Sequence, residues 1–438
     1  MSARSPALRQ QLSLDGIMVE MRTGTHRRRV VILITAVVAA SLHQAPASAP
    51  QDTPPWARFG VSVAAVPDAI FVAASPMRGA KRGPGEVHVF ERSESRWVRA
   101  AELSVPEATI EDLFGISMAA DGDTLVVGAQ FADARGKDSG LAYVFERRAA
   151  RWHQAAVLSA SDAAAGDQFG LTVSVRGETI VVGARLADSH GVDAGAAYVF
   201  TRHDGRWQQA AKLMASDAAA GDLFGRVSIG EHVMVVSADL NDDRGSNAGK
   251  AYAFESRAGV WTEVATLAAK DGTAGDEFGV SLALTGDTAV FGAIGSDSRG
   301  EDSGAAYVFE RRQSQWTQAA RLSASDGARR QQFGSAVGVD AGTIVVGAPD
   351  DGGKGKGAGA AYVFERGTDG WTEAAKLTAS DAAAASWFGS TVAVSGNTIV
   401  VGMHLNGEGK RPGAAYVFER RQGAWSEVAR LGPAGAAP

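Results

Sequence analysis

The chain contains no cysteine among its 438 residues. Disulfide bonds, thiolate metal sites, cysteine nucleophiles and a lipid-modified anchor cysteine are therefore excluded. Aromatic residues are also scarce, at 7%, whereas glycine occurs 53 times. This balance suits many short strands joined by tight turns better than long helices. No window longer than a few residues repeats its apolar positions at the helical period, so we expect an all-β protein.

An excess of basic charge is missing as well. The chain has 43 Lys and Arg residues against 49 Asp and Glu residues, a formal net charge of −6. Affinity for nucleic acids comes mainly from neutralising phosphates with basic side chains. The sequence also offers no polybasic patch for an anionic lipid surface. The composition therefore argues against a nucleic-acid or lipid partner.

The N-terminal segment has the basic, apolar, small-residue order of a secretory signal. Three arginines at 27–29 precede the apolar run 30–42, and small residues surround a cleavage position after Ala47. The 13-residue run is shorter than the roughly 20 residues that span a bilayer. An uncleaved anchor is the alternative.

We therefore expect residues 1–47 to be an N-terminal extension and signal peptide, and residues 48–56 to be a linker. The mature chain is expected to be exported to the periplasm, the cell surface or the medium. Met18 and Met21 are alternatives to Met1 as the translation start, because residues 1–20 resemble neither a signal nor a folded segment.

A repeat of 54 or 55 residues dominates the rest of the chain. Each unit opens on a Phe-Gly pair and later carries a tryptophan, which is followed six positions on by a leucine. We expect the phenylalanines to lie in the core and the tryptophans to pack between blades. The phenylalanines are Phe59, Phe114, Phe169, Phe224, Phe278, Phe333 and Phe388, and the tryptophans are Trp97, Trp152, Trp207, Trp261, Trp316, Trp371 and Trp425.

Each unit contains four strand signals, which are clearest in the third unit. Residues 171–175 alternate in polarity, 179–182 form a continuous β-branched run, and 196–200 and 207–213 follow after turns. Alternating runs indicate strands that are covered on one face, and continuous apolar runs indicate strands buried on both faces. The second strand of each unit is therefore expected to lie deep between neighbouring sheets.

A four-stranded sheet cannot bury both of its faces alone. Radial closure of the units buries these faces and leaves no exposed terminal sheet. An open solenoid would need polar capping units, but the first and last units are as apolar as the others. We therefore predict a closed seven-bladed β-propeller of four-stranded antiparallel blades over residues 57–431. No strand is exchanged between the first and last blades, and 432–438 form a disordered tail.

The Phe-Gly pair followed by a β-run and Gly-Ala resembles the FG-GAP repeat, known from the integrin α-subunit head and from exported bacterial proteins. The similarity is greatest to the bacterial branch, whose repeat contains Ala-Ser-Asp, Gly-Asp-x-Phe-Gly and Ala-Tyr-Val-Phe. The resemblance covers about residues 56–431 and implies a propeller. Gly-Ala stands at 128–129, 183–184, 292–293 and 347–348, and the Ser-Asp and Gly-Asp elements at 161–162, 166–167, 216–217 and 221–222.

Calcium is a candidate ligand of the loops, although not at the integrin position. Integrin repeats often carry calcium between the first two strands, where this chain has only a tight turn such as 121–123. Between the second and third strands, units two to five instead hold acids around a glycine, and hard cations prefer such oxygen ligands. Asp and Asn also cap turns, so the turn interpretation stays open beside calcium. The candidate ligands are Asp133, Asp138, Asp188, Asp193, Asp239, Asn241, Asp243, Asp297 and Asp302.

A second set of acids precedes four of the Phe-Gly pairs. We expect these acids to hold the loop that joins one blade to the next, because they recur with the repeat. A cation-attracting ring around one end of the axis is the alternative. The four acids are Asp112, Asp167, Asp222 and Asp276.

Units one, six and seven carry basic loops at the junction where units two to five are acidic. These three units become neighbours when the ring closes, so one rim is expected to have a basic arc and an acidic arc. The basic arc suits a partner with negative charge, either a protein or an anionic glycan. Its residues are Lys81, Arg82, Lys354, Lys356, Lys410 and Arg411.

The sequence contains no recognisable catalytic motif. It has no Gly-x-Ser-x-Gly elbow and no phosphate-binding loop, and its histidines do not share a metal-binding spacing. We therefore expect a monomeric, non-catalytic binding or scaffold module with no certain cofactor. A carbohydrate-binding propeller is the alternative, with Trp56 and Trp387 as the off-repeat aromatics. An enzyme with a site in the axial channel is a third interpretation.

Overall fold

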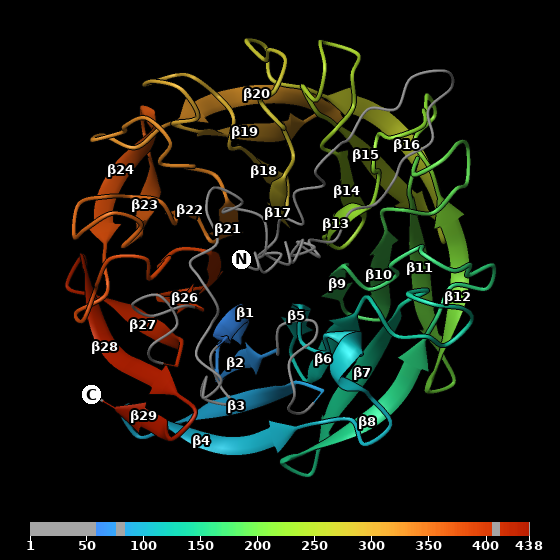
Figure 1. Cartoon of the computed structure of the whole chain (residues 1–438), viewed down its shortest axis with the longest axis horizontal. Helices are drawn as coiled ribbons and strands as arrows, with labels where there is room; N and C mark the ends of the chain where they lie inside the picture. Colours follow the sequence, from blue (N-terminus) through green and yellow to red (C-terminus); the bar gives the residue numbers. More distant parts are fainter. Residues whose placement is uncertain (1–57, 76–83, 405–411, 438) are drawn as a thin grey trace, which may run out of the picture.

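The computed structural model describes residues 58–75, 84–404 and 412–437. Within these residues, seven antiparallel sheets surround a central axis, each with its first strand inside and its fourth strand outside (Figure 1). The predicted seven-bladed all-β propeller is confirmed. Each sheet is built from strands that are consecutive in the chain, so none of the strands in residues 58–75, 84–404 and 412–437 is exchanged between blades.

Blades 1 to 4 contain β1 (Phe59–Val66), β2 (Ala69–Ala74), β3 (Glu86–Ser93), β4 (Arg96–Leu103), β5 (Ser117–Asp121), β6 (Thr124–Ala129), β7 (Leu141–Arg148), β8 (Arg151–Leu158), β9 (Thr172–Arg176), β10 (Thr179–Ala184), β11 (Ala196–His203), β12 (Arg206–Leu213), β13 (Arg226–Ile229), β14 (Val233–Ala238), β15 (Lys250–Arg257) and β16 (Val260–Leu267). A 3-10 helix, η1 (Ile110–Asp112), precedes β5. Blades 5 to 7 contain β17 (Ser281–Thr285), β18 (Thr288–Ala293), β19 (Ala305–Arg312), β20 (Gln315–Leu322), β21 (Ala336–Asp340), β22 (Thr343–Ala348), β23 (Ala360–Gly367), β24 (Gly370–Leu377), β25 (Thr391–Ser395), β26 (Thr398–Met403), β27 (Ala414–Arg421), β28 (Ala424–Gly432) and β29 (Gly435–Ala437).

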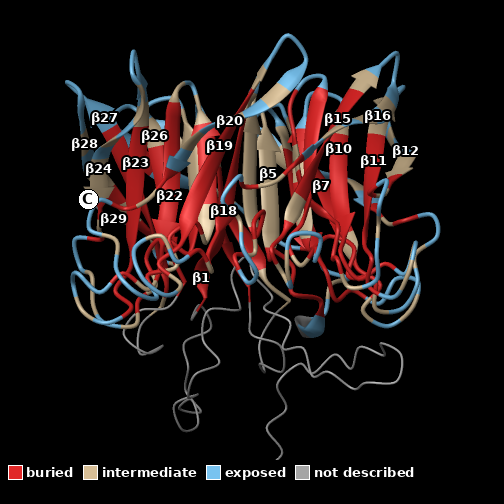
Figure 2. Ribbon diagram, turned by 90° about the horizontal axis from the view of Figure 1, so that it is seen from above, coloured by how far each residue is buried: buried red, intermediate tan, exposed pale blue. Residues whose placement is uncertain are grey.

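The apolar core lies between the blades rather than inside them. Seven clusters of buried side chains each combine residues of two adjacent blades. In β10, Ile180, Val181 and Val182 are fully buried, whereas the outer strand β12 alternates between exposed and partly buried positions. Figure 2 shows the same gradient, with the middle strands of the blades buried, the innermost strand β5 partly buried and many loop residues at the two ends exposed. The prediction that second strands are covered on both faces is confirmed.

The repeated aromatics have the packing roles expected from their spacing. Phe169 is fully buried, and its ring centroid lies 5.6 Å from that of Tyr198. Trp152 of blade 2 meets Phe71 of blade 1 edge-on at 5.2 Å, so it packs between blades. Edge-on contacts of this kind add to the stabilisation from burial alone.

The glycine of the Phe-Gly pair allows one blade to approach the next closely. Gly170 has a φ of +93°, and a Cβ at this position would lie 2.2 Å from the carbonyl oxygen of Leu141 in the preceding blade. The hydroxyl of Ser117 donates a hydrogen bond of 2.8 Å to the carbonyl of Gly170. A side chain at this position would separate the two blades.

Blade 7 meets blade 1 through contacts of the same kind. A buried cluster joins Phe59 and Val63 to side chains of blade 7, including Val417. The hydroxyl of Thr391 donates to the carbonyl of Gly60 at 3.2 Å. The ring is therefore closed by side-chain packing and local hydrogen bonds, and none of the described strands pairs across the seam.

A belt of ion pairs, here called the inter-blade belt, links third strands around the ring. In each pair an arginine of one blade meets a glutamate of the preceding blade. The pairs are Arg147–Glu91, Arg202–Glu146, Arg311–Glu255, Arg366–Glu310, Arg420–Glu365 and, across the seam, Arg92–Glu419. Thr201 and Ser256 take the two positions at the junction of blades 3 and 4, so both partners change together there.

Blade 7 has a fifth strand that the sequence does not predict. β29 pairs antiparallel with β28 within the segment that we expected to be a disordered tail. The guanidinium of Arg99 donates to the carbonyl of Pro433 at 3.0 Å, which brings this end of the chain beside blade 1. Gly432, Pro433 and Gly435 give no strand signal, and the pairing comes from the open edge of β28.

The expected signal segment and linker lie outside the described residues. Among the residues that the structure does describe, there is no helix of sufficient length and apolar character to cross a membrane.

Candidate functional site

The long loops and the crossovers between blades share one end of the propeller, and the short turns lie at the other (Figure 2). We call the first end the loop face. It carries the connections between second and third strands, where the sequence places both the calcium candidates and the basic arc. Loops on a rigid scaffold are the usual carriers of binding residues.

The acids predicted to bind calcium cap their own loops. In blades 2, 3 and 5, the first acid of each loop accepts a hydrogen bond from the backbone N–H of the second acid, five residues later. These bonds are Asp138 N to Asp133 at 2.7 Å, Asp193 N to Asp188 at 2.9 Å and Asp302 N to Asp297 at 3.0 Å. The turn interpretation therefore describes these side chains, and calcium stays a prediction.

The blade 4 candidates point to three different partners. Asp239 pairs with Arg185 at 2.5 Å, and Asp243 pairs with Lys250 at 2.7 Å. The Asn241 amide donates to Asp222 at 3.1 Å. Although this loop has the most candidate oxygen ligands, its three side chains do not converge on one position where a cation could bind. A calcium ion would have to displace Arg185 and Lys250 before binding there.

The acids before the Phe-Gly pairs act as loop-fixing residues, as expected. Each accepts a hydrogen bond from the backbone N–H three residues earlier, at 2.8 to 3.1 Å. Gln331 accepts the equivalent bond in the crossover to blade 6. Their repeated geometry assigns the acids to the crossover rather than to a charged funnel.

A buried group of charges lies where blades 3, 4 and 5 meet, and we call it the blade 4 charge cluster. It contains the buried residues Arg185, Arg226 and Asp239 and the half-buried Glu277. Asp239 lies 2.5 Å from Arg185 and 3.5 Å from Arg226, and all three side chains are 3–4% exposed. Burial and the charge of Arg185 lower the pKa of Arg226 to about 10. Burial and the charge of Asp239 raise the pKa of Glu277 to about 7.

The raised pKa of Glu277 predicts a specific pH dependence of stability. Between its ordinary pKa of 4.5 and about 7, the folded state binds more protons than the unfolded state. The free energy of unfolding therefore falls as the pH rises through this window. We expect Glu277→Gln to remove this fall. The free energy of unfolding of the variant, relative to that of the wild type, should therefore be higher at pH 8 than at pH 5 by on the order of 2 kcal/mol.

Urea denaturation at pH 5 and pH 8 measures the effect as a difference between the variant and the wild type. Glu94→Gln is the control, because Glu94 is exposed in a turn. Equal pH profiles for Glu277→Gln and the wild type would contradict the raised pKa.

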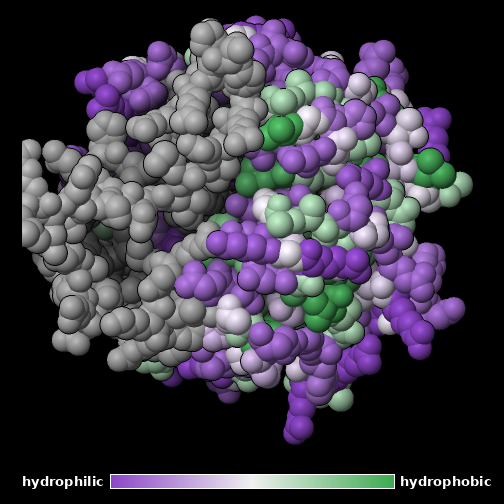
Figure 3. Space-filling view, turned by 45° about the vertical axis from the view of Figure 1, so that its right-hand side comes forward, coloured by the Kyte–Doolittle hydropathy of each residue, from purple (hydrophilic) through white to green (hydrophobic). Residues whose placement is uncertain are grey.

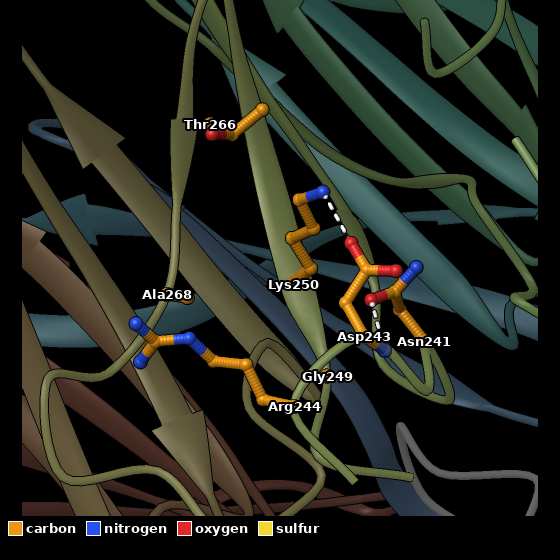
Figure 4. A pocket seen from close by; sticks show the side chains of 7 residues that line it. All are labelled: Asn241, Asp243, Arg244, Gly249, Lys250, Thr266 and Ala268. Carbon is orange, nitrogen blue, oxygen red and sulfur yellow. Dashed lines mark hydrogen bonds and ion pairs between the residues drawn. The ribbon is translucent and has the colours of Figure 1, made fainter. Parts of the chain in front are cut away.

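A groove of about 490 Å³ opens on blade 4, between the β14–β15 loop and the end of the outer strand β16 (Figure 4). Its lining includes Lys250, Arg244, Asp243 and Thr266. Thr266 is short, whereas blades 3, 5, 6 and 7 carry a lysine or arginine at this position of the outer strand. The groove exists because Thr266 does not fill the space that a lysine or arginine side chain would occupy. Arg244 forms one side of the groove and donates a hydrogen bond to the carbonyl of Ala269. The groove is polar and carries both charges.

The structure describes only part of the predicted basic arc. Lys354 and Lys356 are exposed on the loop between β22 and β23. Burial raises the pKa of the neighbouring Asp350 to about 6, although the charge of Lys356 acts in the opposite direction. Lys81, Arg82, Lys410 and Arg411 lie outside the described residues.

Sequence reasoning missed a buried pair near the seam. The hydroxyl of Ser390 lies 2.8 Å from Nδ1 of His404, and the Trp387 ring packs 5.4 Å from the imidazole. Burial and the charge of Arg58 lower the pKa of His404 well below its usual value. His404 directly follows the Gly-Ala position, which is followed by Gln130, Arg185 and Asp239 in blades 2 to 4. The different residues at this position of the repeat were the sequence signal that could have identified it as a special site.

The family model of the FG-GAP repeat matches more than half of the chain. The matched segments are residues 97–145, 152–200, 207–254, 261–309, 316–364 and 371–418. The chain belongs to the FG-GAP repeat family. Each matched segment begins at the outer-strand tryptophan of one blade and ends in the third strand of the next, so the FG-GAP repeat is offset from the blade by one strand.

No curated protein is detectably similar in sequence to this FG-GAP protein. Among solved structures, Sqt1 from Chaetomium thermophilum is similar, with a TM-score of 0.46 and 14% sequence identity. The similarity covers 88% of this chain and 86% of that chain.

Proposed function

We propose that this FG-GAP propeller is an exported, monomeric, non-catalytic binding module that engages an acidic segment of a partner protein through its loop face. The observation that supports this proposal most directly is that Lys354 and Lys356 present their positive charge to solvent. Both are exposed, and neither has an ion pair within the described residues. The lysines on the blade flanks, in contrast, are paired with aspartates: Lys212 with Asp162, Lys250 with Asp217 and Lys376 with Asp326.

The character of the surface supports a contact driven by charge. The face in Figure 3 is mainly hydrophilic, and its apolar side chains form small groups rather than one continuous patch. The large exposed apolar side chains of the described residues are all valines: Val98, Val157, Val192, Val260 and Val264. An interface without a large apolar patch depends more on complementary charge, which sets specificity and association rate.

Export is proposed on the basic, apolar and small-residue order of residues 1–47. The non-catalytic assignment is supported by the burial of the Ser390–His404 pair, because a nucleophile and its base must reach a substrate. Trp387 is half-buried and its ring packs at a tilt against that of His404, which supports a packing role for this tryptophan over sugar stacking.

Binding to a defined acidic probe tests the proposal. The full chain is titrated by surface plasmon resonance against a synthetic glutamate-rich peptide and, separately, against heparin. We expect the double variant K354E/K356E to bind the peptide at least tenfold more weakly, and we expect binding to weaken as salt is added. Lys137→Glu is the matched control, since Lys137 is exposed on the equivalent loop of blade 2.

Unchanged peptide binding by K354E/K356E would assign these lysines to solvated surface and overturn the proposal. Binding to heparin but not to the peptide would instead identify an anionic glycan as the partner.

A further inference from the structure

Blade 1 departs from the other six blades at three positions of one flank. At the first position of the third strand it has Glu86, and two residues later it has His88, where every other blade has tyrosine. In the outer strand, directly before the repeated leucine, it has Glu102. The equivalent tyrosines are Tyr143, Tyr198, Tyr252, Tyr307, Tyr362 and Tyr416. The equivalents of Glu102 are Val157, Lys212, Thr266, Arg321, Lys376 and Arg430.

The strand register brings the three side chains together. Glu86 and His88 are two residues apart on β3, so their side chains project from the same face. His88 and Glu102 are direct cross-strand partners between β3 and β4. His88 Nε2 lies 2.5 Å from a carboxylate oxygen of Glu86, and ligand atoms of all three side chains lie within 4.8 Å of one another.

The size of the imidazole explains why the site forms only here. His88 packs its ring 5.0 Å from that of Phe59, where tyrosines of the other blades pack 5.5–5.7 Å from their phenylalanines. In blades 4, 6 and 7 the longer phenol reaches an aspartate of the crossover, as Tyr252 reaches Asp217 at 2.7 Å. The shorter imidazole ends inside the flank, at the height of the two glutamates.

We propose that Glu86, His88 and Glu102 bind a divalent transition-metal ion of the Zn²⁺ class. Zn²⁺ takes imidazole nitrogen at about 2.0–2.1 Å and carboxylate oxygen at about 2.0–2.2 Å, so small side-chain adjustments bring the three ligands to one ion. Ca²⁺ takes 6–8 oxygen ligands, and the nitrogen donor selects against it. The site is therefore distinct in chemistry and position from the calcium candidates of the loop face.

Burial differs among the three ligands, and this leaves one coordination position open. The side chains of His88 and Glu86 are 1% and 11% exposed, whereas that of Glu102 is 44% exposed. Three protein ligands and one exchangeable position facing solvent are typical of an open zinc site. Glu102 also pairs with Arg99, and the metal ion would replace this arginine as the counter-charge of the carboxylate.

The test uses the untagged full chain, freed of metal by EDTA and titrated with ZnCl2 by isothermal calorimetry. We expect one high-affinity Zn²⁺ ion per chain and a rise in melting temperature, because an ion that binds only the folded state stabilises it. CaCl2 at the same concentration should not reproduce the site. Substitution with Co²⁺ should give the visible absorption bands of a four-coordinate nitrogen and oxygen site.

The informative variant is His88→Tyr, which introduces the residue that the other six blades already hold. We expect it to fold with an unchanged circular dichroism spectrum and to lose zinc affinity by at least about 100-fold, since even second-shell changes cost 10–100-fold. Glu102→Gln keeps the side-chain shape and should weaken binding without changing the melting of the metal-free protein. His153→Tyr is the control, because His153 is exposed on β8 of blade 2.

Wild-type zinc affinity in His88→Tyr, or no zinc binding by the wild type at 1 mM ZnCl2, would overturn the proposal. An equal loss in His153→Tyr would assign the binding to surface histidines and overturn it as well.

Discussion

Asp239→Ala is expected to lower the free energy of unfolding by about 3–5 kcal/mol, the usual cost of removing one partner of a buried ion pair. The carboxylate of Asp239 lies between Arg185 and Arg226, whose side chains are 3% and 4% exposed. Without it, two buried positive charges face each other across the junction of blades 3 and 4. This is also the junction that lacks the ion pair of the inter-blade belt. Urea denaturation at pH 7 measures the loss.

Asp243→Ala is the matched control for this prediction. Asp243 stands on the same loop and also pairs with a basic residue, but its side chain is 56% exposed. An exposed ion pair contributes about 0–1 kcal/mol, so this variant should differ little from the wild type. Equal losses in the two variants would contradict the importance of burial.

A rescue variant tests whether unpaired buried charge causes the loss of stability in Asp239→Ala. The neighbouring blades show which neutral residues fit these positions: Gln130 stands at the position of Arg185, Leu171 at that of Arg226 and Ile294 at that of Asp239. Gln332 stands at the position of Glu277 in the crossover to blade 6. We expect the quadruple variant R185Q/R226L/D239I/E277Q, which neutralises the whole cluster, to recover most of the stability lost in Asp239→Ala. Replacing a complete buried ion group by well-packed neutral residues is often neutral or stabilising.

Phe169→Ala should cost about 3–5 kcal/mol, the range for truncating a buried phenylalanine. The side chain is fully buried and packs against Tyr198 and Phe200, with ring centroids 5.6 and 6.0 Å away. A closed ring has no terminal unit that can fray independently, so we expect one cooperative thermal transition at a lower temperature. Val264→Ala is the control, because Val264 is 43% exposed. A biphasic transition in Phe169→Ala would contradict the cooperativity of the ring.

The sequence predicts the architecture because the same few residues recur at a fixed spacing. The Phe-Gly pairs, the tryptophans and the continuous second strands each have one role, and this role is repeated seven times. β29 could not be predicted in the same way, because Gly432, Pro433 and Gly435 in and before it favour turns and β29 is stabilised by pairing with the free edge of β28. The basic arc stays a prediction: Lys354 and Lys356 are exposed, and its other four residues lie outside the described residues.

The candidate sites were harder to predict because they join residues of different blades or strands. Arg185 and Asp239 stand at equivalent positions of adjacent units. An alignment of the units shows that these two positions carry opposite charges, which predicts an ion pair between the blades. The same alignment would have shown His88 and Glu102 as departures from the repeat. The calcium candidates had the opposite problem, since an acid in a loop has the same sequence whether it binds a cation or caps its own backbone.

The seam between blades 7 and 1 is built like the other junctions: it has the close contact of the Phe-Gly glycine and the arginine–glutamate pair that five of the other six junctions contain. Within the described residues, the seam therefore lies between two complete sheets and interrupts neither of them. Circularly permuted versions of the protein, with the old ends joined and new ends placed in another crossover, should keep the same ring. Gene duplication or deletion of one matched segment would likewise change the number of blades without forcing any strand to find a new partner.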